Sequence, residues 1–137
     1  MRRFLLTMAT AASALAVASC SDLTGVRGDL AGTYELETID GQVLPQTVPD
    51  DEFGTVSLVY GEIELNSDGT FVDFYQFVAP GSSFVRSREF FGRWELEGNS
   101  RIRFETDNGG EYFMERTSGN RIAYVDNSGS RWVYDRF

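Results

Sequence analysis

Residues 101–136 read RIRFETDNGGEYFMERTSGNRIAYVDNSGSRWVYDR. Apolar residues fall two apart in this stretch, as Ile102 and Phe104 do, and polar residues stand between them. Such alternation indicates a β-strand with one buried face and one solvated face. Clusters of Gly, Asn, Asp and Ser interrupt the alternation, and these residue types favour tight turns. The stretch therefore predicts four successive antiparallel strands, over residues 101–106, 111–117, 121–126 and 131–136.

The same alternation continues upstream to residue 32. In residues 32–39, Tyr34 and Leu36 alternate with glutamates. The dipeptide Asp40-Gly41 follows, and it is favoured in two-residue hairpins because both positions tolerate positive φ. Further strands are predicted over residues 42–48, 55–66, 70–78 and 84–97. Prolines weaken and end the first of these, since proline cannot donate a hydrogen bond to a sheet.

Together these segments predict an all-β domain. They amount to eight or nine strands, each an antiparallel neighbour of the next. A sheet of that size tends to curl and close, because closure removes both exposed edges. We therefore expect a single antiparallel up-and-down β-barrel of eight to nine strands. The interior of an eight-stranded barrel is either filled by its own side chains or holds one small ligand.

The first 19 residues have the layout of an export signal. Met1, Arg2 and Arg3 form a short positive cap, and the uncharged apolar run from Phe4 to Ala18 follows. This order is typical of secretory signal peptides. The apolar run is shorter than the roughly 20 residues that a transmembrane helix needs. We therefore predict that residues 1–19 are a signal peptide.

The residues Val17-Ala18-Ser19-Cys20 resemble the bacterial lipobox. The resemblance implies that Cys20 receives a lipid and becomes the first residue of the mature protein. Cys20 is the only cysteine, so the chain cannot form an internal disulfide. Ser21, where an Asp would retain a lipoprotein in the inner membrane, implies passage to the outer membrane. We expect a lipid-anchored protein of the cell envelope that faces the periplasm, with residues 20–31 as a flexible tether and residues 32–137 as the barrel.

Composition disfavours several functions. Without residues 1–19 the chain holds 10 Arg against 21 Asp and Glu, a net charge of −11. Such a surface repels nucleic acid. The chain has no His and no Lys, so the usual general base, the Schiff-base amine and the commonest metal ligand are missing. We expect no enzymatic activity, no metal and no cofactor.

Three short motifs resemble the bacterial lipocalin-like domains found on small lipoproteins. They are AGTYEL at residues 31–36, LNSDGTF at residues 65–71 and GRWEL at residues 92–96. The resemblance implies an open-ended cup that carries a small apolar molecule. Lipocalins have Gly-x-Trp in their first strand, and Tyr34 takes the position of that Trp. The resemblance further implies a cation over the Tyr34 ring, supplied by Arg131 or Arg136.

The inner face of the predicted barrel supplies the candidate binding residues. They are mostly large aromatic side chains, which commonly line pockets for small molecules. The candidates are Tyr34, Phe71, Tyr75, Phe77, Trp94, Phe104, Tyr112 and Trp132. The alternative is that these aromatics simply fill a small barrel.

Charged residues give weaker candidates. Arg86 and Arg88 alternate with other residues near a predicted barrel mouth, where they could hold an anionic ligand. Glu62 and Glu64 lie two apart on one strand and so share its wet face, which predicts solvated surface charge and no catalytic pair. The same holds for Glu95 and Glu97.

Two functions are consistent with this sequence. The first is a lipid-anchored cell-envelope protein whose small β-barrel binds a small hydrophobic ligand. The alternative is an envelope accessory or inhibitor protein that acts through protein–protein contacts and has a solidly packed barrel. In both cases the lipid on Cys20 attaches the protein to the membrane.

Replacing the predicted lipid site gives a direct test of anchoring. We expect Cys20→Ser to block processing or to release the domain into the soluble periplasmic fraction, because serine offers no thiol for acylation. Cell fractionation and labelling with a radioactive fatty acid measure this. Unchanged membrane retention together with unchanged acyl labelling would refute the lipid anchor.

Overall fold

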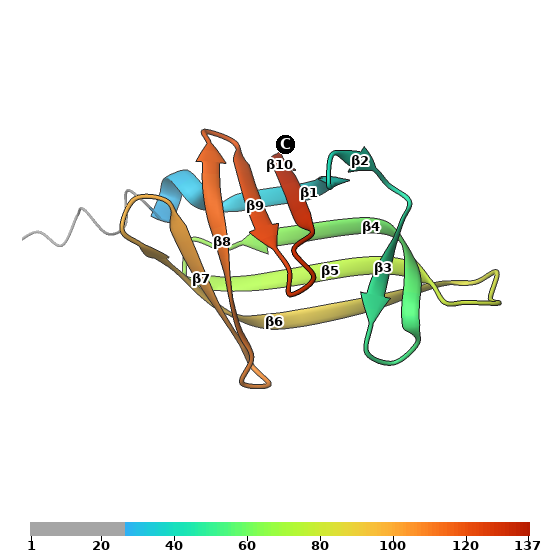
Figure 1. The fold of residues 1–137 in the computed structure, drawn as a ribbon. Coiled ribbons are helices and arrows are strands. Elements are labelled where there is room, and N and C mark those ends of the chain that lie inside the picture. Colours follow the sequence, from blue (N-terminus) through green and yellow to red (C-terminus); the bar gives the residue numbers. More distant parts are fainter. Residues whose placement is uncertain (1–26) are drawn as a thin grey trace, which may run out of the picture.

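The alternating segments form strands throughout the part of the chain that the computed structural model describes, residues 27–137 (Figure 1). The predicted signal at residues 1–19 and the predicted lipid site Cys20 lie outside these residues. The strands, in chain order, are β1 (Gly32–Ile39), β2 (Gln42–Val43), β3 (Gln46–Asp50), β4 (Gly54–Leu65), β5 (Thr70–Val78), β6 (Val85–Glu97), β7 (Arg101–Thr106), β8 (Glu111–Ser118), β9 (Arg121–Val125) and β10 (Arg131–Arg136).

Eight of the strands close into an antiparallel barrel. From β4 to β10, each strand pairs with the next along the chain. Strand β1 lies between β4 and β10, the two end strands of this series, and pairs with both. Tyr34 of β1 pairs with Arg136 of β10 and with Ile63 of β4. This confirms the predicted all-β class and the up-and-down barrel, with two further strands added to the eight.

The two additional strands replace one predicted strand. The sequence pattern predicts a single strand over residues 42–48, but Pro45 lies between β2 and β3. Proline lacks the N–H that a continuing ladder requires. As a result β2 pairs with the end of β1, whereas β3 pairs with the first half of β4. The second half of β4 pairs with β1, so the long strand β4 serves two neighbours on the same edge.

A helical turn at residues 27–30 precedes the barrel and belongs to it. Leu30 has no exposed surface, and its carbonyl accepts a hydrogen bond of 2.8 Å from the Tyr34 hydroxyl. Arg136, at the other end of the domain, donates a hydrogen bond of 2.6 Å to the carbonyl of Asp29. These contacts attach the helical turn, at the end of the predicted tether of residues 20–31, to the barrel through Leu30 and the Asp29 carbonyl.

The arginine that was expected over the Tyr34 ring lies elsewhere. Arg136 pairs with Tyr34 across the strands, but its guanidinium covers Gly32: a Cβ added at Gly32 would lie 2.6 Å from the Arg136 Nε. Arg131 lies at the opposite end of β10, where it pairs with Val125. The cation–π contacts between described residues involve other pairs. Hence Arg136 closes the strand end and does not stack on the tyrosine.

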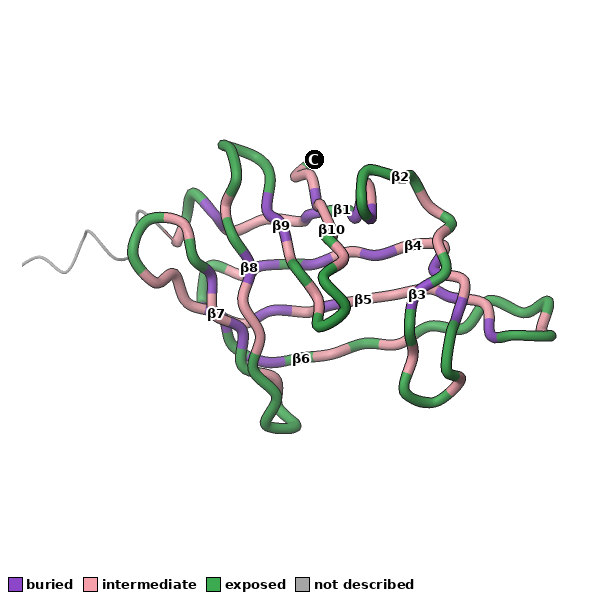
Figure 2. The backbone as a smooth tube through the Cα atoms, in the orientation of Figure 1, coloured by how far each residue is buried: buried purple, intermediate pink, exposed green. Residues whose placement is uncertain are grey.

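Aromatic packing fills one part of the barrel. The rings of Phe71 and Phe104 meet edge to face with centroids 5.0 Å apart, and Phe104 stacks on Tyr112 at 4.7 Å. Trp94 is also buried, and its indole N–H donates to the carbonyl of Asn66 at 2.9 Å. Figure 2 shows the resulting alternation of buried and exposed positions along the strands, with exposed residues concentrated in the turns. Within residues 27–137, no helix has both the length and the apolar character needed to cross a bilayer.

Gly92 allows β6 and β7 to approach closely. A Cβ added there would lie 1.9 Å from the carbonyl oxygen of Glu105 and 2.8 Å from the Cα of Thr106. Both obstacles are backbone atoms, which cannot rotate away as a flexible side chain can. Any residue larger than glycine therefore forces these two strands apart.

We expect Gly92→Ala to lower the free energy of unfolding by about 2 to 3 kcal/mol, as overpacking of a core does. Gly119→Ala is the matched control, because no atom lies within 4 Å of its Cβ position. Urea unfolding of the purified variants measures both. Equal stability of the two variants would contradict the close approach of β6 and β7.

Candidate ligand-binding site

Strand β5 turns every second side chain into the barrel, and one of them is acidic. Phe71, Asp73, Tyr75 and Phe77 share this inward phase. Asp73 is only 4% exposed and is the buried charged residue of the described chain. An ionised carboxylate in such surroundings is unfavourable unless it is paired or hydrogen-bonded. Its partners therefore decide what this part of the interior can do.

Tyrosine hydroxyls partly satisfy Asp73. Its Oδ2 accepts hydrogen bonds from the Tyr75 hydroxyl at 2.9 Å and from the Tyr112 hydroxyl at 3.1 Å. The Tyr134 hydroxyl lies 3.2 Å from that of Tyr75 and extends the network to β10. Asp73 Oδ1 is buried and has no hydrogen-bond partner among the described residues. The acid therefore has one satisfied oxygen and one oxygen with unused acceptor capacity.

Burial dominates the ionisation of this acid. Removal from water raises the pKa of Asp73 to about 7, although the hydrogen bonds from Tyr75 and Tyr112 act in the opposite direction. Burial also raises the pKa values of Tyr75 and Tyr134 well above their ordinary range, so both tyrosines stay neutral. Near neutral pH the interior thus holds an acid that readily gains or loses its proton.

A cavity of about 290 Å³ lies beside Asp73. Its wall combines aromatic rings, one methionine, the acid and polar groups from the β7–β8 turn. The lining residues are Asp73, Tyr75, Phe90, Thr106, Asn108, Gly110, Tyr112, Met114 and Tyr124. The β7–β8 turn hangs from the lower side of the barrel in Figure 1, as does the β3–β4 turn.

A second cavity of about 180 Å³ adjoins the first. Tyr75 and Phe90 line both, so these two rings form a partition between them. The second cavity is otherwise mostly apolar, with Trp132 and Phe77 in its wall and a charged pair at its edge. Such a pair of chambers, apolar with a few polar groups, is typical of sites for small molecules.

The charged pair at the second cavity joins Arg88 to Asp50. Arg88 Nη1 lies 2.7 Å from Asp50 Oδ2, and its guanidinium also lies 5.1 Å from the centroid of the Phe77 ring. Burial pushes the pKa of Asp50 upward, but hydrogen bonds from Arg88 and from the backbone N–H groups of Phe53 and Glu52 hold that pKa below its ordinary value. Arg88 borders the second cavity, and Asp50 already compensates its charge there.

The predicted candidates divide into two groups. All eight point into the barrel and belong to its core or pack against it. Tyr75, Phe77, Tyr112 and Trp132 line the two cavities. The other four fill the interior and line neither cavity: Tyr34, Phe71, Trp94 and Phe104. The barrel is therefore solidly packed at one part and hollow at another.

Sequence reasoning missed the acid of the site. Asp73 has the same inward phase as Phe71 and Tyr75, and this phase is the signal that the strand offers. A lone aspartate on a strand is usually solvated, so the phase alone does not single it out. Phe90, Met114 and Tyr124 are also absent from the candidates, since only the fold shows which inward residues border empty space.

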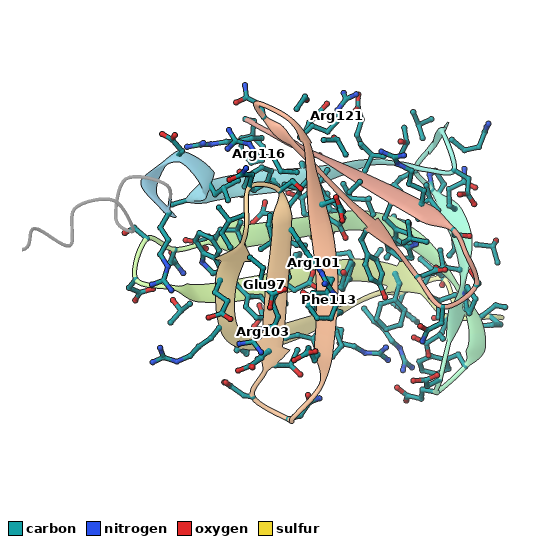
Figure 3. All side chains as sticks on the ribbon, turned by 60° about the vertical axis from the view of Figure 1, so that its left-hand side comes forward. Glu97, Arg101, Arg103, Phe113, Arg116 and Arg121 are labelled. Carbon is teal, nitrogen blue, oxygen red and sulfur yellow. The ribbon has the colours of Figure 1, made fainter. Side chains whose placement is uncertain are left out.

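Arg86 pairs with Phe77 across the strands, and its guanidinium lies 5.1 Å from the centroid of the Phe53 ring. The carboxylates Glu95 and Glu97 lie on the outer surface. Arg103 forms ion pairs with Glu95 and Glu97, and Figure 3 shows Arg103 and Glu97 on the outer face of the sheet. Beside them the guanidinium of Arg101 lies 3.8 Å from the centroid of the Phe113 ring. Glu95 and Arg103 border a hollow of about 100 Å³ together with Glu105, whereas Glu97 does not line it.

Comparisons with known proteins add no closer identification. A scan against known protein families finds none that matches the chain, and a search among curated proteins finds no matching sequence. The closed eight-stranded barrel is compatible with a lipocalin-like fold. Membership in that family stays a prediction from the short sequence motifs.

The buried acid makes stability depend on pH. In the folded chain the pKa of Asp73 rises from 3.8 to about 7. Between these values the folded state keeps a proton that the unfolded state loses, so the contribution of Asp73 to stability falls as pH rises. An asparagine at this position would not titrate, and its contribution would not change with pH.

We therefore expect Asp73→Asn to become more stable relative to wild type by about 2 to 3 kcal/mol between about pH 5 and about pH 8. Chemical unfolding across this pH range measures the difference. Asp51→Asn, at an exposed position of the β3–β4 turn, is the control and should show no such trend. A constant difference between Asp73→Asn and wild type would show that Asp73 does not titrate in this range.

Proposed function

We propose that this barrel binds a small, mainly apolar molecule, as a lipoprotein of the cell envelope attached to the outer membrane through Cys20 and facing the periplasm. The observation that carries the proposal is the aromatic cavity beside Asp73. At about 290 Å³ it is roughly twice the 150 Å³ that suffices for benzene inside a protein. The anchor and the location are carried by the N-terminal sequence alone.

The chemistry of the walls supports binding over catalysis. The cavity presents Phe90, Met114 and three tyrosines, which offer apolar contact and hydroxyl groups. Asp73 is the ionisable acid in that wall, and a single buried acid is short of the paired groups that acid–base hydrolysis commonly uses. The proposal is therefore a carrier or receptor role.

The position of the cavity supports access for a ligand. Thr106, Asn108 and Gly110 belong to the end of β7 and the β7–β8 turn, and each lines the cavity. Turns are the parts of a barrel that move most easily. A ligand can enter past this turn without breaking any of the strand pairs that close the barrel.

A second candidate function rests on the β5–β6 hairpin. Its loop projects beyond the barrel, on the side of Figure 1 opposite the helical turn. Phe84 is 77% exposed there and Val85 is 57% exposed. Exposed apolar residues on a projecting loop favour contact with a partner protein. This supports the accessory or inhibitor role as the alternative.

Filling the cavity mouth tests ligand binding. Thr106 has the inward phase of Phe104, and its side chain borders the cavity. We expect Thr106→Tyr to weaken binding of the neutral fluorescent probe N-phenyl-1-naphthylamine at least tenfold, because the added ring occupies the space of the probe. Thr117→Tyr, at an exposed position near the end of β8, is the matched control and should bind the probe as wild type does.

Native mass spectrometry and solvent extraction of the purified protein complete this test. A co-purifying small molecule that is lost in Thr106→Tyr would support the proposal. If the probe does not bind and extraction yields no small molecule, the barrel is not a carrier. In that case the exposed hairpin becomes the site to examine, by comparing pull-downs with wild type and with Phe84→Ser.

A further inference from the structure

The cavity beside Asp73 holds a negative group without a positive partner. Asp73 Oδ2 accepts two tyrosine hydroxyls, and Oδ1 has no partner among the described residues. The ion pairs that the described arginines form are all with other carboxylates. The chain also has no Lys and no His that could approach. Among residues 27–137, then, no ion pair neutralises this acid, which leaves room for a cation supplied by a ligand.

We propose that the ligand of this barrel is a small organic amine, whose protonated nitrogen pairs with Asp73 while aromatic rings surround it and its apolar part. This inference rests on the proposed function, because it names the class of molecule held in the same cavity. The ligands of this class share one chemical feature, a positive nitrogen next to an apolar group.

The aromatic lining is suited to a cation. Tyr75, Phe90, Tyr112 and Tyr124 border the cavity together with the acid. The Tyr75 and Phe90 rings meet edge to face with centroids 6.4 Å apart, and so do Tyr112 and Tyr124 at 5.7 Å. The face of an aromatic ring attracts a cation, most strongly where water is excluded. A lining that combines aromatic rings with a carboxylate is complementary to an ammonium group.

The charge of the surroundings disfavours an anion. The whole chain has a net charge of −9, which repels anions and attracts cations. Arg88, the cation that borders the neighbouring cavity, is held by Asp50 at 2.7 Å. A fatty acid or another carboxylate would thus place its charge near Asp73 with no free cation to receive it.

The proton that Asp73 binds provides a second way to detect an amine ligand. Burial raises the pKa of Asp73 to about 7, so the empty site is about half protonated at neutral pH. The groups that face Asp73 from β5, β8, β9 and β10 are Tyr75, Tyr112, Tyr124 and Tyr134, and burial raises the pKa of each above its ordinary value. They keep their protons at neutral pH. An arriving cation therefore displaces the proton of Asp73.

Three compounds of the same shape separate the ligand classes. They are 2-(1-naphthyl)ethylamine, 2-(1-naphthyl)ethanol and 1-naphthylacetate, which differ mainly in charge. Calorimetric titration of the purified protein near pH 7 measures their affinities. We expect the amine to bind at least tenfold more tightly than the alcohol, and the carboxylate to bind most weakly.

Two variants test whether Asp73 causes the preference for the amine over the alcohol. We expect Asp73→Asn to reduce the amine-to-alcohol ratio of affinities at least tenfold. Asp107→Asn is the matched control, because it removes an exposed carboxylate from the β7–β8 turn at the edge of the cavity. It should preserve the ratio, whereas loss of the ratio in both variants would assign the preference to general surface charge and overturn the role of Asp73.

Proton release offers a readout that needs no variant. At a pH where Asp73 is partly protonated, the amine should release protons on binding, since the ion pair needs the ionised carboxylate. The calorimetric heat then depends on the ionisation enthalpy of the buffer for the amine but not for the alcohol. Equal buffer dependence for both compounds would overturn the ion pair even if Asp73→Asn does not fold.

The outcomes separate this inference from the function on which it rests. Equal affinity for all three compounds, or tightest binding of the carboxylate, overturns the amine class and leaves a ligand-binding barrel. Binding of none of them, with no binding of N-phenyl-1-naphthylamine either, overturns both. Tightest binding of the amine, lost in Asp73→Asn and accompanied by proton release, supports both.

Discussion

Closure of the sheet by its first strand is the constraint on which the rest of this structure depends. The strands from β4 to β10 form a simple meander, and a meander alone has two free edges. β1 pairs with both of these edge strands. Its residue Tyr34 lies between Arg136 of β10 and Ile63 of β4. The same tyrosine reaches the carbonyl of Leu30 and so holds the helical turn against the closed end. Everything that the interior can hold follows from this closure.

Closure places the aromatic side chains in two different roles. At one part of the barrel Phe71, Phe104 and Trp94 pack closely and leave no space for a ligand. At the other part Tyr75 and Phe90 stand between two cavities. One barrel can therefore be solidly packed in one part and still have space for a ligand in another. The packed part supplies stability, and the hollow part is free for function.

Asp73 links stability to the proposed function. A buried acid lowers stability as pH rises through its pKa, unless a partner neutralises it. Tyr75 and Tyr112 supply hydrogen bonds but no charge. A chain selected for stability alone would gain from an uncharged residue at this position, and the proposed cationic ligand would account for the acid. A cationic ligand would recover the stability that the empty site lacks, since binding to the folded state alone stabilises it.

The sequence by itself determined the strands, their order and the antiparallel barrel, because alternation and turn residues are local properties that need no knowledge of distant contacts. It also showed which side chains point inward. Only the tertiary structure decided that residues 42–48 divide at Pro45, that Leu30 joins the core, and which inward residues border a cavity. The physical reason is that empty space, burial and the partners of Asp73 arise between strands distant in sequence, so no single strand records them.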